Sequence, residues 1–582
     1  MTMVHKGFAE VNGKLIHYVR QGSGPAVILL HAAPCSAKVM APFQLVLAER
    51  FTTFAFDLPG FGLSEMLDVP QVETHHLADA IAGAVRALGL TQVAAYGRHT
   101  GAGVAVELAH RHPALCSMVL TDGFPVFAAP YTPERLNEYL LPIEPRWDGS
   151  HLTWTWFRYR EQHIFWPWDR PLAAHRSDCD VPDLDFLYRG TIEMLESGEN
   201  YPKIYASAFR HAGLAMIDAV KPPVCYGNRP GDSQHKTMRL YPPTAWVQEF
   251  PRDAAEAAVL ERDILALHPA STPAPYQSRF QPGAARVTDY VQTSFGPAYT
   301  IGAGLDRKAT PVLILHDLPG AAGLHLEQIE AIGADRPVIA FDFAGHCNSV
   351  PGEGQRAGID TWVAQIREVM AALGFDAAHI YAHGTAAAIA IELASAAPAC
   401  VASLVLHAPP ALEQSLADQL APDYAPDITP SRDGGNFLRL WHHLRDQELW
   451  WPWFDQRRGN ARPAPRIAPD RLHARAVALL KQPAQYRPTW RELLSYPLER
   501  KLRHLTVPTL LVYRDADQFA FARDHAAELL ATKPLHLPET EAEAASRLAP
   551  WFDGLALNTD QDAATAPPAP ATLPAGRAHD RD

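Results

Sequence analysis

The chain is poor in the features that mark several large classes of protein. Only six of its 582 residues are cysteine and no two form a C-x-x-C pair, so we expect no disulfide framework and a cytoplasmic location. No stretch approaches the ~20 apolar residues of a membrane span, and the first residues form no apolar signal region. Positive charge is in deficit, because the net charge is −13 at pH 7. We therefore expect neither nucleic acid nor a membrane as a partner.

What is present is the composition of an ordinary globular protein, with 47% apolar and 20% charged residues. At roughly 100–200 residues per domain, a chain of 582 residues is predicted to hold more than one domain. Its 51 prolines are dense around residues 268–275 and in the tail beyond residue 558. We predict a proline-rich linker over residues 266–285 and a disordered tail over residues 558–582, which has no apolar periodicity.

Short motifs recur along the chain at one fixed offset. His316 follows His31 by 285 residues, and Asp517 follows Asp232 by the same 285 residues. A register that stays constant over about 200 residues indicates a tandem duplication. Three further pairs obey the offset: the loops 57–64 and 342–349, the turns 97–101 and 382–386, and Trp166-Pro167-Trp168 with Trp451-Pro452-Trp453.

Each copy alternates apolar strands with helices, which predicts an α/β fold with a mostly parallel, doubly wound sheet covered on both faces. The first domain is predicted over residues 7–265 and the second over residues 286–553. In each domain an aromatic-rich helical insertion interrupts the alternation, at about 124–216 and about 410–505. These insertions are expected to form caps over the carboxyl ends of the strands, where open α/β sheets bind ligands.

The turn Gly97-Arg98-His99-Thr100-Gly101 lies between an apolar run and a small-residue helix. This is the setting of the G-x-S-x-G nucleophile elbow, in which a sharp strand-to-helix turn exposes a serine above a sheet. Here the central residue is His99. In the second copy the central residue is Gly384, and both flanking glycines are replaced by alanine. Neither turn therefore offers a serine.

Each half resembles an α/β-hydrolase with a helical cap, similar in layout to the epoxide hydrolase, haloalkane dehalogenase and carbon–carbon hydrolase branches. The resemblance covers nearly the whole chain. It rests on the H-x-x-P loop at His31 and Pro34, the D-x-x-G-x-G-x-S loop over residues 57–64, the elbow over residues 97–101 and the late acid Asp232. It implies a nucleophile on the elbow, an activating histidine, an orienting carboxylate and an oxyanion hole.

The histidine that this family carries after its last strand is missing from both copies. No histidine occurs over residues 236–267, and His536 lies inside a strand-like alternation. The route through serine, histidine and an acid therefore fails, and His99 is predicted to act as a general base or, less often, as a covalent nucleophile. Asp232 or Asp122 would orient it. The alternative is that the fold keeps the turn and that the histidine has no function.

The resemblance also implies a binding site around the elbow. Backbone N–H groups of Thr100 and of Ala32 or Ala33 would form the oxyanion hole. In the cap, an aromatic ceiling over the substrate competes with a purely structural role for three residues, namely Trp166, Trp168 and Tyr201. Cys35 could face the same cavity, although free cysteines are usually small buried hydrophobes.

The second copy is predicted to be degenerate, since Gly384 has no side-chain chemistry and Asp517 is vestigial. His407 and His316 could gather near Asp517. We interpret this half as a domain that braces the first or as a second binding site. The flanking glycines that only the first elbow retains favour one active copy and one retired copy.

Two functions of different classes follow from these patterns. One is an enzyme that hydrolyses an activated ester, lactone or thioester with base-activated water, or cleaves or isomerises a substrate next to a carbonyl; cofactor-independent oxygen chemistry is a further option. The other is a non-catalytic ligand-binding or scaffolding pseudo-hydrolase. In both cases the partner is a small molecule and no metal or cofactor is expected. The sequence does not indicate an oligomeric state.

Overall fold

The computed structural model of the protein describes residues 4–127, 131–277, 285–349, 357–555 and 557. The predicted disordered tail (558–582) and part of the predicted linker (278–284) lie outside these residues. Contacts within the chain divide it into two units, Met1–Glu144 with Ser150–Arg279, and Pro145–Gly149 with Phe280–Asp582. Each unit contains one sheet and is described by itself.

The sheet of the first unit has eight strands in the order β1-β2-β4-β3-β5-β6-β7-β8. Strands β1 and β2 pair antiparallel with each other, β2 pairs antiparallel with β4, and the remaining neighbours are parallel. Every residue of β3 and β4 is buried, because helices cover both faces of the sheet. The strands are β1 His5–Val11, β2 Lys14–Gly22, β3 Ala26–Leu30, β4 Thr52–Phe56, β5 Val93–Arg98, β6 Cys116–Asp122, β7 Val224–Asn228 and β8 Trp246–Glu249.

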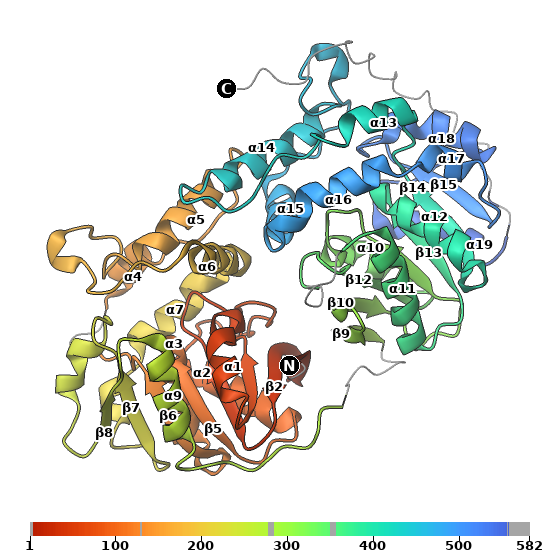
Figure 1. The fold of residues 1–582 in the computed structure, drawn as a ribbon. Helices are drawn as coiled ribbons and strands as arrows, with labels where there is room; N and C mark the ends of the chain where they lie inside the picture. Colours follow the sequence, from red (N-terminus) through yellow and green to blue (C-terminus); the bar gives the residue numbers. More distant parts are fainter. Residues whose placement is uncertain (1–3, 128–130, 278–284, 350–356, 556, 558–582) are drawn as a thin grey trace. The chain divides into compact units, whose positions relative to one another are not determined.

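Helices α1 (Ala41–Leu47) and α9 (Ala254–Leu265) pack together on one face of this sheet, and α2 (Thr74–Ala87) and α3 (Thr100–Arg111) pack together on the other (Figure 1). Alternate residues of β3 point into the first of these layers, where Val27 and Leu29 contact the core formed with α1 and α9. This doubly covered sheet carries the loops that build the site.

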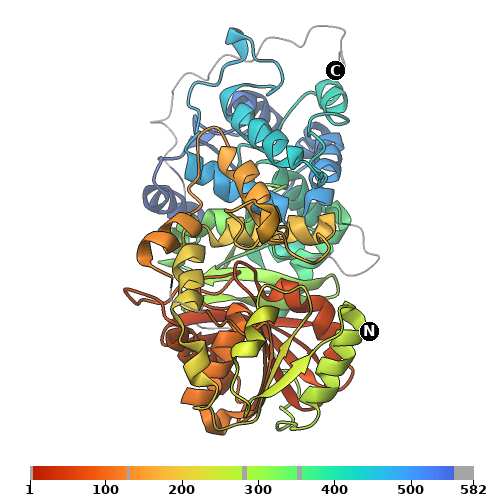
Figure 2. The same cartoon turned by 90° about the vertical axis from the view of Figure 1, so that its left-hand side faces the viewer.

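Between β6 and β7 the chain leaves the sheet and forms the cap. Its helices are α4 Pro133–Tyr139, α5 Ser150–Glu161, α6 Leu184–Ser197, α7 Asn200–Arg210 and α8 Gly213–Met216. The orange-to-gold cap helices gather at one end of the first sheet in both views (Figure 1 and Figure 2). The predicted helical insertion of the first copy therefore exists as an element between two neighbouring parallel strands.

The second unit repeats this topology, with the strand order β9-β10-β12-β11-β13-β14-β15-β16. Its strands are β9 Arg286–Thr293, β10 Gly296–Ala303, β11 Val312–Leu315, β12 Val338–Phe341, β13 Ala378–His383, β14 Val401–His407, β15 Thr509–Tyr513 and β16 Leu535–His536. The predicted fold class, two mostly parallel sheets with helical insertions, is confirmed.

The helices of the second unit also follow the order of the first. They are α10 Leu326–Gly333, α11 Ile359–Leu373, α12 Ala387–Ala396, α13 Gln414–Leu420, α14 Gly435–Leu449, α15 Pro469–Leu480, α16 Pro483–Ser495, α17 Leu498–Leu502, α18 Arg523–Leu530 and α19 Glu541–Phe552. Helices α13 to α17 lie between β14 and β15, which is the place of the cap in the first unit. In the part of the chain that the structure describes, no helix is both long and apolar enough to span a bilayer.

Candidate functional site

The elbow is a one-residue turn between β5 and α3. His99 joins the two elements with φ 47° and ψ −112°, a left-handed conformation that non-glycine residues seldom adopt. The turn is also too tight for side chains on either flank. A Cβ on Gly97 would lie 2.2 Å from the carbonyl oxygen of Gly101, and a Cβ on Gly101 would lie 2.1 Å from that of Leu30. The glycines are needed to bring helix and strand together, and the strained position presents the imidazole.

The imidazole of His99 is held by Asp232, which lies in the loop after β7. Nε2 of His99 is 2.9 Å from Oδ2 of Asp232, and Oδ1 accepts a hydrogen bond of 2.7 Å from the Gln234 N–H. An ionised carboxylate can only accept, so Nε2 carries the proton and the lone pair of the neutral ring is on Nδ1. No described residue forms a hydrogen bond with Nδ1, and the His99 side chain is 29% exposed. A proton acceptor is therefore free at the elbow.

The electrostatics of this pair favour proton transfer near neutral pH. Burial lowers the pKa of His99, but the Asp232 carboxylate outweighs burial and holds that pKa above its ordinary value of 6.5. Burial also opposes ionisation of Asp232, yet His99 and the Gln234 N–H keep its pKa well below the usual range. Asp232 stays ionised while His99 gains and loses a proton.

Asp122, the other predicted partner of His99, uses its carboxylate elsewhere. Its Oδ2 lies 3.0 Å from Nε of Arg229 and 3.5 Å from Nε of Arg98. Among the described residues, its one hydrogen bond with His99 is made by its backbone carbonyl, which accepts the His99 N–H at 3.1 Å. Of the two candidate acids, the structure brings Asp232 to the imidazole and pairs Asp122 with arginine.

The predicted oxyanion donors belong to the elbow and to the H-x-x-P loop. Thr100 is the first residue of α3, so its N–H has no acceptor within the helix. No described residue accepts the N–H of Ala33, and the buried Thr100 hydroxyl has no partner either. The carbonyl of Ala32 helps to hold the loop together, because it accepts hydrogen bonds from the His31 ring and from the Cys35 N–H. The N–H of Ala32 has no acceptor among the described residues either, so Thr100 and one of Ala32 and Ala33 remain the candidate donors.

The remaining motif residues fix the loops around these donors. His31 is fully buried; Nδ1 donates to the Ala32 carbonyl and Nε2 accepts the Leu58 N–H, each at 2.9 Å. The Asp57 carboxylate accepts backbone N–H groups from both loops, at 2.6 Å from Ala37 and 2.9 Å from Leu63. These two side chains hold the loops that flank the elbow in place.

A family model described as alpha/beta hydrolase fold matches two separate regions of the chain, residues 25–175 and 310–545. The two regions fall in the two units, each with its own sheet of the same topology. The chain belongs to the alpha/beta hydrolase family. It is a tandem duplication of two such domains, as the fixed offset predicts.

Several curated relatives of this alpha/beta hydrolase are named as enzymes, among them the following two hydrolases. A 2-(acetamidomethylene)succinate hydrolase of Mesorhizobium japonicum is 34% identical over 144 residues, which are 24% of this chain and 48% of that protein. A soluble epoxide hydrolase of Corynebacterium is 35% identical over 102 residues, 18% of this chain and 35% of that protein. The chain thus spans half or less of the length of these relatives.

Solved structures of similar fold include an epoxide hydrolase A from Mycobacterium thermoresistibile. It is 17% identical, with a TM-score of 0.34, and the match covers 46% of this chain and 96% of that one. An epoxide hydrolase from Vigna radiata is 18% identical, with a TM-score of 0.35, over 45% of this chain and 97% of that one.

Cys35 does not supply a nucleophile to the first hydrolase domain. Its Sγ lies 3.5 Å from the Tyr159 hydroxyl in a fully enclosed position. Burial raises the pKa of the Cys35 thiol to about 12, so the thiolate is absent at neutral pH.

The aromatic residues expected in the hydrolase cap pack against one another. The Trp168 indole N–H donates to the Tyr139 carbonyl at 3.1 Å, and Trp166 stacks parallel to Phe209 with ring centroids 6.4 Å apart. Tyr201 is fully buried, but its hydroxyl has no hydrogen-bond partner. The tryptophans fasten the cap, whereas Tyr201 keeps a polar group free inside it.

One charged residue at the centre of this cap was not found by sequence reasoning. The guanidinium of Arg158 is fully buried and lies 4.2 Å over the Trp168 ring. The available signal was the 285-residue offset, which aligns Arg158 with His443 in otherwise similar helices. Nothing in the sequence, however, indicated that this position of α5 faces inward.

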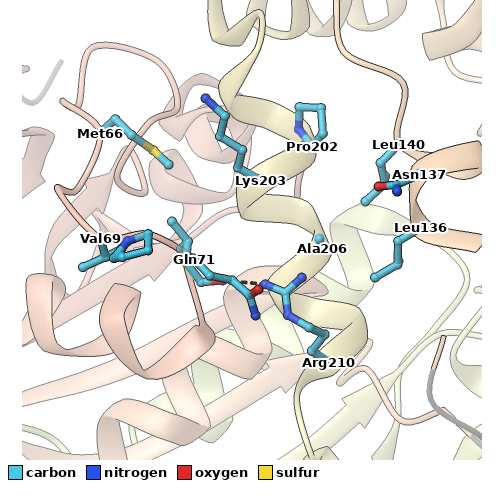
Figure 3. A pocket seen from close by; sticks show the side chains of 12 residues that line it. Met66, Val69, Gln71, Leu136, Asn137, Leu140, Pro202, Lys203, Ala206 and Arg210 are labelled. Atoms are coloured by element: carbon cyan, nitrogen blue, oxygen red, sulfur yellow. Dashed lines mark hydrogen bonds between the residues drawn. The ribbon is translucent and has the colours of Figure 1, made fainter. Parts of the chain in front are cut away.

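The open pocket in Figure 3 lies away from the elbow. It has a volume of about 260 Å³ and is formed by α4, α7 and the loop before α2. At its floor Arg210 contacts the loop, donating to the Val72 carbonyl and to Glu73. Its lining contains neither His99 nor Asp232: Met66, Val69, Pro70, Gln71, Val72, Leu136, Asn137, Leu140, Pro202, Lys203, Ala206 and Arg210.

In the second domain, the aspartate that corresponds to Asp232 pairs with a different histidine. Asp517 pairs with His407, whose Nε2 is 2.9 Å from Asp517 Oδ2, while Nδ1 accepts a hydrogen bond of 2.8 Å from the Tyr381 hydroxyl. Both ring nitrogens of His407 are thus used. His316, which was expected near Asp517, instead bonds the Asp317 carbonyl and the backbone of the following loop, as His31 does in the first domain.

The oxyanion position of the second domain is closed. The Thr385 hydroxyl donates to the Leu318 carbonyl at 2.7 Å and accepts the Leu318 N–H at 2.9 Å. Leu318 corresponds to Ala33, so the donor that is free in the first domain is occupied here. At Gly384 a Cβ would meet only the Asp317 Cβ, 3.7 Å away, and the elbow presents no side chain. Among the described residues, no three His, Cys, Asp or Glu side chains are arranged to hold a metal ion.

Proposed function

We propose that the first domain hydrolyses a small carbonyl substrate, such as an ester, lactone or thioester, with His99 as general base and Asp232 as its orienting acid. The observation that carries this proposal is the pairing of His99 Nε2 with Asp232 Oδ2 at 2.9 Å on the elbow, with Nδ1 left free. Hydrolases among the curated relatives support hydrolysis as the reaction class.

In this reaction Nδ1 of His99 takes a proton from a water molecule as the water oxygen attacks the carbonyl carbon. The carbonyl π electrons move to oxygen, and the N–H groups of Thr100 and of Ala32 or Ala33 stabilise the resulting oxyanion. When the carbonyl re-forms, the bond to the leaving group breaks and the imidazolium returns its proton to that group. No covalent enzyme intermediate is needed, which fits an elbow without serine.

The second domain is proposed to be non-catalytic. His407 has no free ring nitrogen, and the Thr385 hydroxyl occupies the oxyanion loop. Its role would be structural or the binding of a ligand without turnover.

A panel of 4-nitrophenyl esters, thioesters and lactones tests the proposal with the full-length protein and its His99→Ala variant. General base catalysis typically contributes about 10²- to 10⁴-fold, so we expect a loss of that order in kcat. Undiminished turnover in His99→Ala would overturn the role of His99. If no member of the panel is turned over but a small molecule raises Tm, the non-catalytic ligand-binding alternative is favoured.

The pH profile separates a base from a merely structural histidine. Because Asp232 holds the pKa of His99 above 6.5, kcat/KM should rise with pH through that raised pKa and then level off. In Asp232→Asn the carboxylate is gone while burial remains, so the rise should move to lower pH and the plateau should fall. A profile that is the same in both proteins contradicts the pairing.

A further inference from the structure

Arg158 is a buried cation without an internal counter-charge. Its side chain is fully buried in the cap, on α5, yet none of the ion pairs among the described residues includes it. Two acids that follow it along the chain are already paired, Glu161 with Arg160 and Asp169 with Arg135. A charge removed from water is costly unless a partner of opposite sign compensates it.

The Arg158 guanidinium contacts Gln162 and two aromatic rings, and one edge of it has no hydrogen-bond partner. Nη1 donates to Gln162 Oε1 at 3.0 Å, one face lies on the Trp168 ring, and the Tyr139 ring centroid is 5.8 Å from Cζ. Nε and Nη2, the two nitrogens of the remaining edge, are buried and have no hydrogen-bond partner. The free donors therefore form a fork and are not scattered.

This edge of an arginine matches a carboxylate elsewhere in the same chain. Nε and Nη2 of Arg111 donate to the two oxygens of Asp79 at 2.9 and 2.8 Å. Such parallel, bidentate pairs are the strongest contacts that arginine makes with carboxylates. Arg158 presents the same two donors with the carboxylate absent.

A polar group beside the fork is unpartnered as well. The buried Tyr201 hydroxyl has no partner at ordinary hydrogen-bond geometry, and it lies beside the Arg158 guanidinium, which counters the rise that burial gives the pKa of Tyr201. Buried donors in native proteins are nearly always satisfied, so several orphans around one cation indicate a ligand position.

The helix that carries the fork also touches the loop that follows β3, because the Tyr159 hydroxyl lies 3.5 Å from Cys35 Sγ. His163 has a buried, unpartnered Nε2, and its pKa is lowered to about 4 by burial and by the positive charges of Arg98, Arg158 and His99. Arg158 and His99 are therefore both near enough to this imidazole to lower its pKa.

We infer that Arg158 binds a carboxylate of the substrate, with its Nε and Nη2 donating to the two carboxylate oxygens and the Tyr201 hydroxyl assisting. This rests on the proposed function: the substrate would be a small carboxylic acid that carries its ester, lactone or thioester carbonyl toward His99.

The second domain supplies an internal comparison. There His443 takes the place of Arg158. Its ring centroid lies 4.6 Å from that of Trp453 in a tilted arrangement and 5.8 Å from that of Tyr486 in an edge-on one, and these two residues are the counterparts of Trp168 and Tyr201. Burial and Arg475 lower the pKa of His443 to about 3, so this ring is neutral. The same aromatic frame therefore holds a cation in one copy and a neutral ring in the other, and the frame itself does not require the charge.

Isothermal titration of the full-length protein with benzoate, benzamide and phenyl phosphate tests the inference without turnover. Benzoate should bind at least tenfold more tightly than benzamide, its neutral isostere, and more tightly than phenyl phosphate. Arg158→His, which copies the second domain, and Arg158→Met should bind benzoate and benzamide equally. Arg158→Lys keeps the charge without the fork and should retain part of the preference.

Equal binding of benzoate and benzamide by the unaltered protein would overturn the inference, as would an unchanged preference in Arg158→His. Tighter binding of phenyl phosphate would overturn the choice of a carboxylate. Unchanged circular dichroism and benzamide affinity establish that the variants fold. His99→Ala should bind benzoate normally, so loss of the His99 role and loss of the Arg158 site give different results.

Discussion

At the scale of the residue, the proposed function of His99 depends on how little space surrounds its ring. Gly123, directly after β6, has φ +77°, and a Cβ there would lie 3.2 Å from both Cε1 and Nε2 of His99 and 3.5 Å from Asp232 Oδ1. The second domain carries Ala408 at this position, where the elbow has no side chain to crowd. Ala408 also has a positive φ, 45°, so the fold imposes this backbone in both domains, and the missing Cβ at Gly123 in addition leaves room for the His99 ring.

Gly123→Ala should displace the imidazole by a few tenths of an ångström and lower kcat by roughly 10- to 100-fold, because small misplacements of a catalytic group are expensive. The measurement is the initial rate on the substrate found in the ester panel. Gly89→Ala is the matched control: its φ is +73° and nothing lies within 4 Å of the new Cβ, so it carries only the backbone penalty. Equal losses in the two variants would mean that crowding of His99 plays no part.

At the scale of the element, the junction of β5 and α3 determines whether the site exists. The helix starts so close to β3 that the backbone at Gly101 touches the Leu30 carbonyl, and this contact fixes the direction in which the Thr100 N–H points. In the second domain the corresponding turn begins with a 3-10 helix over Gly384–Ala386 and accommodates alanine at both flanks. The two elbows share a fold position but not a packing.

Gly101→Ala should destabilise the first domain by about 3 kcal/mol or more, because its Cβ would overlap a backbone atom that cannot move aside. Gly103→Ala, one half-turn further along α3, meets nothing closer than 3.6 Å and should be neutral or stabilising by up to about 1 kcal/mol. Urea denaturation followed by circular dichroism compares them. A Gly101→Ala variant as stable as Gly103→Ala would show that the turn is looser than the structure has it.

At the scale of the whole molecule, both domains contain a histidine–aspartate pair, but the histidine comes from a different element in each domain. The acid after the seventh strand pairs with the elbow residue His99 in the first domain and with the β14 residue His407 in the second. In the first arrangement one ring nitrogen of His99 has no hydrogen-bond partner among the described residues. In the second, both ring nitrogens of His407 form hydrogen bonds, with Tyr381 and Asp517. The same two residue types thus give a candidate base in one place and an interior support in the other.

Asp517→Asn should lower the stability of the protein by about 1–3 kcal/mol, because it weakens the buried support of His407. It should leave turnover unchanged, whereas Asp232→Asn at the equivalent position should reduce it. Thermal unfolding and initial rates, measured on both variants, decide this. If Asp517→Asn removes turnover, the activity does not belong to the first domain alone.

The sequence by itself determined the duplication, the fold class and the place of the elbow, because these depend on apolar periodicity and on motifs that occur twice in one register. It also named His99 and Asp232, since glycine-flanked turns and strand ends are visible in one dimension. The choice between Asp232 and Asp122 came only from the tertiary structure, because both follow strands and only packing shows which carboxylate Arg229 takes. The role inferred for Arg158 could not be predicted from the sequence for the same reason. Its burial and its lack of a counter-charge depend on the residues that surround it in the folded protein.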